Sequence, residues 1–515
     1  MDGPGRLKRL RELLKLTQRE LAKEMKVTHG AIALWERGER PIAGPVLRLI
    51  QFYEEEIGLL SYDERISDEF DHILSSQIQR QAKIGKLMTN AFWDWIGLTL
   101  RSIFRSRKNK TIVYQKVFLS MANAIVKELG QMKGLPMKLG QIFSFLDFAM
   151  PEEARAAFEK LQTSSSPLSY SKLVQILKED LKIDPKDIFA QLSRRPIASA
   201  SIGQVHLAKL KNREIVAVKV QYPEIAEAIR ADLKNLSCMN PFIKYLFLEK
   251  EKGALITELS DRFLEECDYQ KEIQNQEHFR TLFENHPQIV IPRVLKDLSG
   301  RRVICSEYWA GQSFQEFSKN ASQEEKNRAG EVIWQFAFES IFRHGIFNAD
   351  PHPGNYLFEG GKIIFLDFGC VRKFSLKFIS GWKSIIRSVL ESNDEKVIDG
   401  LFDVGMIKTL TGLDRAHMMR LIRSVYEPCL VDSQYSFAKD YSQKTFHLWF
   451  RDNPNREKMF LAQEWIFLMR LTWGVGSILS KLEARSNWRQ KLIPLVYDEG
   501  SSSVPEPIPL PRSTD

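Results

Sequence analysis

The chain has 515 residues, of which 43% are hydrophobic and 27% are charged, as in ordinary globular proteins. Its formal net charge of +9 favours anionic partners, such as nucleotides, nucleic acid or an acidic membrane surface, without choosing among them. The 5 cysteines form no C-x-x-C pair, which argues against a disulfide framework or a zinc site and favours a reducing compartment. The sequence opens without the apolar core of a signal peptide, and Arg470 interrupts the apolar stretch Trp465–Leu479. We therefore expect a buried helix in that stretch and a cytoplasmic protein.

Residues 1–60 predict a small all-α domain. Thr17 is placed to cap a helix that begins at the next residue, and a second helix is expected to begin near Thr28 and to end at Gly38. This pattern resembles the Cro/repressor type of helix-turn-helix. The expected core positions are Leu21, Ala22, Met25, Val27, Ile32 and Trp35.

In helix-turn-helix proteins of this type, the second helix enters the major groove of duplex DNA. The resemblance therefore implies a duplex DNA partner, bound through residues 17–38. The start of the second helix lacks the Gln or Ser that reads bases well, so direct base readout is expected to be weak. A helical bundle used for protein contacts is the alternative. The implied base-facing positions are Thr28, His29, Gly30 and Ala33, and the implied phosphate contacts are Gln18 and Arg37.

Residues 61–110 form a connector that turns from polar to basic. In its last part the apolar stretch Phe92–Leu100 is followed by cations from Arg101 to Lys110. Such a sequence suits peripheral contact with an anionic membrane surface or lipid. A helix packed on the following domain, with a solvated basic end, explains the same pattern and is the alternative that we favour.

Residues Arg194–Leu210 predict a strand, a tight turn of small residues and a second strand. Small side chains leave the N–H groups of such a turn open to anionic oxygens, so the turn is a candidate phosphate loop. In the next strand, Lys219 lies in the apolar run Val216–Val220, like the kinase lysine that holds nucleotide phosphates. A lysine in an apolar strand needs a buried partner of opposite charge. The candidate loop residues are Ala198, Ser199, Ala200, Ser201 and Gly203.

Three polar residues after position 342 occur in the order found in protein kinases. Asp350 and Asn355 are separated as are the Asp and Asn of the kinase catalytic loop, and an apolar strand leads into Asp367-Phe368-Gly369. One hairpin is expected to bring the three side chains together, and hard oxygen ligands beside a phosphate tail suit Mg²⁺. By analogy with kinases, Asn355 and Asp367 are the predicted magnesium ligands and Asp350 is the predicted catalytic base.

The octapeptide Asn348–Asn355, N-A-D-P-H-P-G-N, followed by L-D-F-G, resembles the signature of the AarF/UbiB atypical kinase-like family. The family usually has histidine at the position of Asn348, which lies outside the predicted ligand set, so we expect the change to be tolerated. An alanine-rich loop, matched here by Ala198–Ser201, replaces the glycine-rich loop of ordinary kinases. The resemblance covers about residues 111–490, and the family includes mitochondrial proteins that support coenzyme Q synthesis.

The resemblance implies further site residues that ordinary kinases lack. The segment M-K-L-G-Q corresponds to the family's K-x-G-Q element and implies that Lys138 and Gln141 lie over the active site. Glu266 and Asp268 correspond to its E-x-D element, expected on one helix and close enough to pair with Lys138. Glu272 is the implied partner of Lys219, with a catalytic role.

The covering segment and the stiffer alanine-rich loop favour a small-molecule phosphoryl acceptor or ATP hydrolysis over ordinary protein phosphorylation. We therefore expect an enzyme that uses ATP and Mg²⁺, tied to lipid or quinone metabolism, located in the cytoplasm or peripherally at the membrane. A DNA-binding regulator that senses nucleotide is the main alternative, and a pseudokinase is the second. The oligomeric state is left open.

The expected fold class is α+β: a bilobal protein-kinase-like fold with a family-specific helical N-terminal extension, preceded by an all-α helix-turn-helix domain. The two kinase lobes follow from a strand-rich segment and a helix-rich segment in succession. The predicted domains are the helix-turn-helix domain (1–60), the connector (61–110), the helical extension with the K-x-G-Q motif (111–167), the N-lobe (168–310), the C-lobe (311–497) and a disordered tail (498–515).

Overall fold

The structure is a computed structural model that describes residues 3–57, 168–200, 202–227, 230, 265–438, 441–446, 448–449, 453–460 and 463–497. The predicted connector, helical extension and C-terminal tail lie outside the described residues. By its contacts the chain divides into two compact units. The first comprises Met1–Thr17, Trp35–His278 and Pro292–Trp309, and the second comprises Gln18–Leu34, Phe279–Ile291 and Ala310–Asp515.

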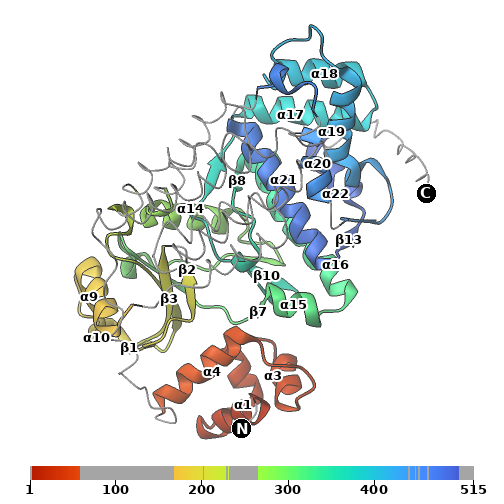
Figure 1. Ribbon diagram of the computed structural model, residues 1–515. Coiled ribbons are helices and arrows are strands. Elements are labelled where there is room, and N and C mark those ends of the chain that lie inside the picture. Colours follow the sequence, from red (N-terminus) through yellow and green to blue (C-terminus); the bar gives the residue numbers. More distant parts are fainter. Residues whose placement is uncertain are drawn as a thin grey trace, which may run out of the picture. The chain divides into compact units, whose positions relative to one another are not determined.

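Residues 3–57 contain four helices, of which the second and third are the pair that the helix-turn-helix pattern predicts (Figure 1). Lys26, with a φ of 53°, lies in the turn before the second helix of the motif. That helix begins where Thr28 Oγ1 accepts a hydrogen bond from the N–H of Ala31 at 3.2 Å, and Gly38, with a φ of 72°, follows its end. The predicted core positions Leu21, Ile32 and Trp35 are buried. The helices are α1 (Gly3–Leu13), α2 (Gln18–Glu24), α3 (His29–Glu36) and α4 (Gly44–Glu56).

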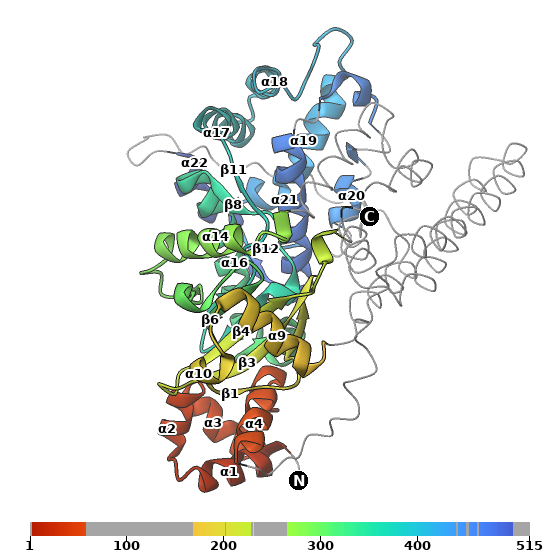
Figure 2. The ribbon, with the colours of Figure 1, turned by 90° about the vertical axis from the view of Figure 1, so that its left-hand side faces the viewer.

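The first unit contains a five-stranded antiparallel sheet in the order β1-β3-β4-β6, with β2 paired to β3. Its central strand β4 has the β-branched run that the sequence predicted, because such side chains pack well on a pleated surface. Helix α9 packs against β4 and β6 and crosses the sheet in Figure 2. The elements are α9 (Tyr170–Leu181), α10 (Pro185–Ile188), β1 (Phe189–Leu192), β2 (Ala198–Ala200), β3 (Gly203–Leu210), β4 (Ile215–Gln221), α14 (Tyr269–Leu282), η5 (Lys296–Leu298) and β6 (Val303–Glu307).

The second unit contains two small sheets that shape the predicted catalytic segment. One has the strand order β5-β10-β9-β7, and the other pairs β8 with β11. The turn between β9 and β10 is Gly360-Gly361, with φ values of 56° and 76°. Two positive φ values suit the tight hairpins that favour glycine. The strands are β5 (Ile289–Val290), β7 (Gln312–Ser313), β8 (Ile346–Asn348), β9 (Tyr356–Glu359), β10 (Lys362–Phe365) and β11 (Val371–Lys373).

Helices make up most of the second unit, and α16 and α21 run side by side in it (Figures 1 and 2). Helix α16 starts at a capping box of Ser322 and Glu325 and ends at Gly345, whose φ of 66° suits a glycine C-cap. The other elements are α15 (Phe314–Asn320), η6 (Pro353–Asn355), α17 (Leu376–Leu390), α18 (Asp394–Asp403), α19 (Arg415–Leu430), β12 (Tyr435–Ser436), α20 (Tyr441–Phe446), η8 (Arg456–Lys458), β13 (Arg485–Ser486) and α22 (Trp488–Val496), besides α16 (Gln323–His344) and α21 (Gln463–Leu482).

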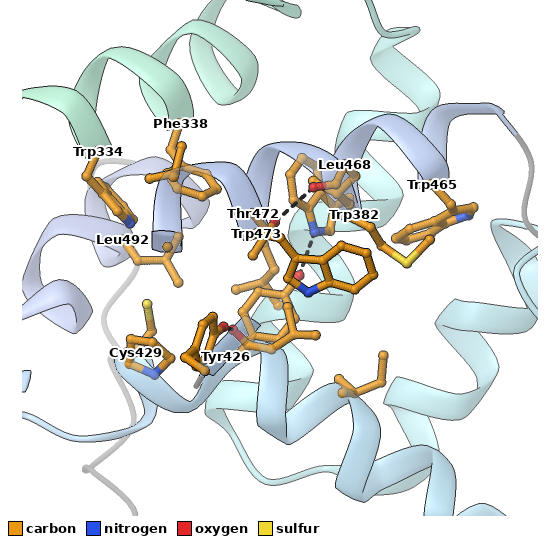
Figure 3. A pocket seen from close by; sticks show the side chains of 18 of the residues that line it. Trp334, Phe338, Trp382, Tyr426, Cys429, Trp465, Leu468, Thr472, Trp473 and Leu492 are labelled. Atoms are coloured by element: carbon orange, nitrogen blue, oxygen red, sulfur yellow. Dashed lines mark hydrogen bonds between the residues drawn. The ribbon is translucent and has the colours of Figure 1, made fainter. Parts of the chain in front are cut away.

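Helix α21 confirms the buried helix predicted for Trp465–Leu479. A cavity of about 70 Å³ lies beside it, and the described residues that line it carry no charge. In its wall, Trp382 donates a hydrogen bond from Nε1 to the hydroxyl of Tyr426 at 2.7 Å (Figure 3). Among the helices of the described part of the chain, none is both long and apolar enough to span a membrane.

Candidate active site

The predicted phosphate loop is shorter than the sequence suggested. Ala198 and Ala200 belong to strand β2, which pairs with β3 so that Ala200 lies opposite Gly203. Most of the residues predicted to form the loop are instead paired strand residues of a β-hairpin. Ser199 pairs with Gln204 in the same ladder, and Ser201 lies outside the described residues.

Gly203 lies against strand β4 so closely that no side chain fits. A Cβ atom at this position would lie 2.3 Å from the main-chain oxygen of Val220 and 2.9 Å from the hydroxyl of Tyr269. Glycine is therefore required by the close approach of two backbones rather than by a positive φ. The start of β3, at Gly203, is therefore held tightly against β4.

Lys219 pairs with Glu272 within the first unit. Its Nζ lies 2.6 Å from Glu272 Oε1, and the two side chains are 19% and 3% exposed. Lys219 is in the middle of β4, between Val205 of β3 and Ile304 of β6. The structure thus supplies the buried partner that a lysine in an apolar strand needs, and it is the residue that the family resemblance implied.

Helix α14 begins directly after the E-x-D element. Asp268 Oδ1 accepts a hydrogen bond from the N–H of Lys271 at 3.1 Å, which caps the helix and leaves Glu272 in its first turn. Asp268 is exposed and lies outside the helix to which Glu266 belongs, one residue before α14 begins. The expectation that Glu266 and Asp268 share one helix is therefore wrong. Lys138 and Gln141 lie outside the described residues.

The predicted catalytic loop of the second unit is held by main-chain and amide hydrogen bonds. The N–H of Ala349 donates to the carbonyl of Cys370 at 2.7 Å, and the N–H of Leu366 donates to the carbonyl of Asn355 at 3.0 Å. Asn355 Nδ2 donates to the carbonyl of Asp350 at 3.2 Å. The amide nitrogen of Asn355 is therefore used inside the loop.

The Asp-Phe-Gly segment is held by an internal hydrogen bond and by burial of its phenylalanine. Asp367 Oδ1 accepts a hydrogen bond from the N–H of Gly369 at 2.9 Å. Phe368 is fully buried, and its ring centroid lies 5.2 Å from that of Phe279. The rotation of the Asp367 carboxylate is limited because its Oδ1 is hydrogen-bonded and the next residue, Phe368, is packed in the core.

Asn348 is a site residue that sequence reasoning undervalued. Its Nδ2 donates to the carbonyl of Asp367 at 2.5 Å, and its Oδ1 accepts from the N–H of Asp350 at 3.1 Å. One amide thereby joins the catalytic loop to the Asp-Phe-Gly segment. The signal that pointed to it was the departure from histidine in the family signature.

Two neighbours of the loop have structural roles. His352 Nδ1 accepts a hydrogen bond from the N–H of Gly354 at 3.0 Å, which favours the tautomer protonated at Nε2. Burial, with a smaller contribution from Asp350, raises the pKa of Tyr356 well above its ordinary value, so this phenol stays neutral. Helix α21 also touches the loop, since a Cβ at Gly474 would lie 2.4 Å from Pro351 Cγ.

Asn355 and Asp367 carry oxygens of the kind that a magnesium ion prefers. Asn355 Nδ2 donates to the carbonyl of Asp350, and Asp367 Oδ1 accepts from the N–H of Gly369. Magnesium is often held by one or two such ligands together with substrate phosphates. Within the described ranges, no group of three or more His, Cys, Asp or Glu residues forms a separate metal site.

At the start of α3, Thr28, His29 and Gly30 are exposed and Ala33 is half-buried. The N–H of Thr28 donates a hydrogen bond to Glu359 Oε1 at 3.0 Å, so this position also contacts the β9–β10 hairpin. Arg37, the implied phosphate contact, pairs with Glu39 at 2.6 Å in an exposed salt bridge. Exposure of the helix start is what contact with a DNA groove requires.

A strand lysine is paired with a helix glutamate, and a loop with an Asp–Asn pair is joined through Asn348 to an Asp-Phe-Gly segment. These features define the class of a protein-kinase-like catalytic domain. More narrowly, residues 160–401 match the ABC1 atypical kinase-like domain, and residues 7–51 match a helix-turn-helix domain. The chain therefore carries an atypical kinase-like domain of the ABC1 type and an N-terminal helix-turn-helix domain.

Named relatives agree with this assignment. The protein "Atypical kinase COQ8, mitochondrial" of Saccharomyces cerevisiae is 29% identical over 385 residues, which are 72% of this chain and 74% of the yeast protein. The protein "Atypical kinase coq-8, mitochondrial" of Caenorhabditis elegans is 32% identical over 314 residues, 58% of this chain and 40% of the nematode protein. The chain thus spans less than half of the nematode relative.

A solved structure, the Rv3197–erythromycin complex from Mycobacterium tuberculosis, resembles the fold with a TM-score of 0.56 and 28% identity. The match covers 75% of this chain and 98% of that chain. With the two domain matches, this likeness confirms the predicted α+β kinase-like fold class with a helix-turn-helix region.

Proposed function

We propose that the chain is an ATP- and Mg²⁺-dependent atypical kinase or ATPase that acts on a small molecule. The observation that carries this proposal is the pair of Lys219 and Glu272, 2.6 Å apart on β4 and α14. In protein kinases such a pair must be in place for phosphoryl transfer, because the lysine holds the nucleotide phosphates.

The proposed roles of the second unit's residues follow from their order and type, which match those of protein kinases. Oxygens of Asn355 and Asp367 would hold Mg²⁺, which when bound neutralises charge on the transferred phosphoryl group. Asp350 would take the proton of the attacking hydroxyl, or of water, as the γ-phosphoryl group leaves the oxygen of ADP. These residue roles are the same for phosphoryl transfer and for ATP hydrolysis. Identifying the phosphorylated product or free phosphate would therefore distinguish the two reactions.

A small acceptor is supported by the first unit. Pairing of β2 with β3 extends as far as Ala200 and Gly203, which gives the phosphate loop little freedom to open for a protein substrate. The K-x-G-Q segment, with Lys138 and Gln141, is proposed to cover the site. The AarF/UbiB resemblance and the COQ8 relatives support an acceptor in lipid or quinone metabolism.

Binding of MgATP to the full-length protein tests the proposal. At a hundredfold excess over its dissociation constant, MgATP should stabilise the fold by about 2.7 kcal/mol and raise the melting temperature. Asp367→Asn should remove the magnesium-dependent part, while Asp399→Asn, an exposed change on α18, should not. A magnesium-dependent shift of wild-type size in Asp367→Asn would contradict the assigned metal site.

A second proposal is that the helix-turn-helix region binds duplex DNA. It is supported by the exposed start of α3 and by the domain match at residues 7–51. Fluorescence anisotropy with a labelled duplex should show binding by the full chain that weakens steeply as salt rises. Arg37→Glu should weaken it more than Lys211→Glu, which makes the same charge change at an exposed site elsewhere. Equal loss in both variants would favour non-specific attraction.

Peripheral membrane contact through residues 92–110 is a third proposal, carried by their apolar-then-basic pattern alone, since they lie outside the described residues. Sedimentation with vesicles of anionic and of neutral lipid would test it. Binding to neither vesicle type would favour a helix packed on the protein.

A further inference from the structure

Tyr269 lies between two parts of the candidate phosphate site. It is the first residue of α14 and is fully buried. The Nζ of Lys219 lies 5.2 Å from the centroid of its ring, and its hydroxyl would be 2.9 Å from a Cβ at Gly203. One side chain therefore touches both the phosphate-binding lysine and the residue that ends the loop turn.

The ring contributes an electrostatic contact to Lys219. An ammonium group within about 6 Å of an aromatic centroid is attracted by the negative face of the ring. Glu272 lies three positions after Tyr269, so the ring and the carboxylate lie on the same face of α14. Lys219 is thus held by a charge partner at 2.6 Å and by an aromatic ring, both from one helix turn.

The hydroxyl end of Tyr269 acts on the other part of the site. Gly203 is packed between the carbonyl of Val220 and this hydroxyl, with no room for a side chain. A tyrosine side chain has few rotatable bonds, so it is a rigid spacer. The separation between Gly203 and the ammonium of Lys219 is therefore set by a rigid group.

We propose that Tyr269 is a positioning residue for nucleotide phosphates, which rests on the proposed ATP-binding function. It holds the Lys219 ammonium at a fixed distance from Gly203 at the start of β3, so that one set of phosphate oxygens can contact both. It does not contact the adenine or ribose in this proposal. Its loss should weaken binding of the phosphate tail and leave binding of adenosine unchanged.

The test compares affinities of the full-length protein for MgATP and for adenosine by isothermal titration. Tyr269→Leu and Tyr269→Met both remove the ring face, and methionine fills irregular space well enough to protect the fold. MgATP binding should weaken roughly 3- to 30-fold, the range that a cation–π contact implies. Adenosine binding should stay within about twofold of wild type by the same reasoning.

Phe189→Leu is the matched control, since it also replaces a buried aromatic residue of the same hydrophobic core, on the outer strand β1. It should change both affinities in step or not at all. An unchanged ratio of MgATP to adenosine affinity in both Tyr269 variants would overturn the proposal. Wild-type protein that binds no MgATP would instead refute the proposed function, so the two failures are distinguishable.

Discussion

The side chain of Asn348 donates a hydrogen bond to the main-chain carbonyl of Asp367 at 2.5 Å. Because the same amide accepts from the N–H of Asp350, it fixes the relative position of two loops that carry the proposed base and a proposed magnesium ligand. Asn348 is not itself a proposed ligand, yet it positions the segments that carry the proposed base and the proposed ligand.

Asn348→Asp should impair ATP turnover with little change in fold. A carboxylate can still accept from Asp350 but cannot donate to Asp367, so two oxygens would face each other, at a cost of about 1–3 kcal/mol. Asn348→His should retain more activity, because neutral imidazole offers one donor and one acceptor. Steady-state ATP hydrolysis and melting temperature would be measured for both. Equal turnover in wild type and Asn348→Asp would show that the bridge is dispensable.

The Lys219–Glu272 pair should show a strong asymmetry between single and double variants. Lys219→Met leaves the carboxylate of Glu272, which is 3% exposed, without its cation, and should cost about 3–5 kcal/mol of unfolding free energy. Adding Glu272→Gln should restore most of that stability without restoring MgATP binding. Urea unfolding and nucleotide titration would be compared. A double variant that binds MgATP normally would contradict the proposed role of Lys219.

His206 should make the stability of the first unit depend on pH. It is fully buried, its Nε2 lies 2.7 Å from Gln204 Nε2, and its Nδ1 lies 2.9 Å from the carbonyl of Ser193. Burial lowers the pKa of His206 to about 4, although the bond to Ser193 opposes this shift. The folded pKa is below the unfolded one, so the stability is fully present above about pH 6.5 and falls as pH drops toward 4, by about 1.4 kcal/mol per pH unit.

Replacement of that histidine isolates its contribution. His206→Gln should flatten the dependence of unfolding free energy on pH between 6.5 and 4, while His278→Gln, an exposed change, should leave the slope as in wild type. Urea midpoints at several pH values would be the measurement. A slope equally steep without His206 would assign the effect to other groups.

Two tryptophans of the cavity wall should respond differently to the same substitution. Trp382 Nε1 donates to Tyr426, whereas Trp465 Nε1 is buried and has no hydrogen-bond partner among the described residues. Both changes to phenylalanine remove the same volume, so the difference between their costs in unfolding free energy reports the contribution of the hydrogen bond. Trp382→Phe should cost about 0.5–1.5 kcal/mol more than Trp465→Phe. Chemical denaturation would test this, and equal costs would show that the bond contributes nothing net.

The sequence was most informative where a residue's role is tied to a short motif. The positions of Lys219, Asp350 and Asp367 follow from strand and loop patterns a few residues long, and so do the helix-turn-helix boundaries. The pairing of Ala198–Ala200 with β3 was missed because small residues have no strong strand preference. The cap formed by Asp268 was missed because the motif reading placed that residue inside a helix.

The partners of contacts between separate segments could not be predicted from local patterns. The bridge from Asn348 to Asp367 joins residues far apart in the sequence through a main-chain carbonyl, which any residue type possesses. The placement of the Tyr269 hydroxyl against Gly203 depends on how α14 packs, which periodicity does not specify. The low pKa of His206 was also not predicted, because it results from burial in the assembled fold.

Gly474 of α21 lies against Pro351, so a helix near the C-terminal end of the chain supports the predicted catalytic loop. The match to the ABC1 domain ends at residue 401, well before this helix begins. A protein shortened at that boundary would keep every motif residue and yet lose the wall behind its catalytic loop. A fragment expressed for kinase assays should therefore extend well beyond residue 401 and include α21.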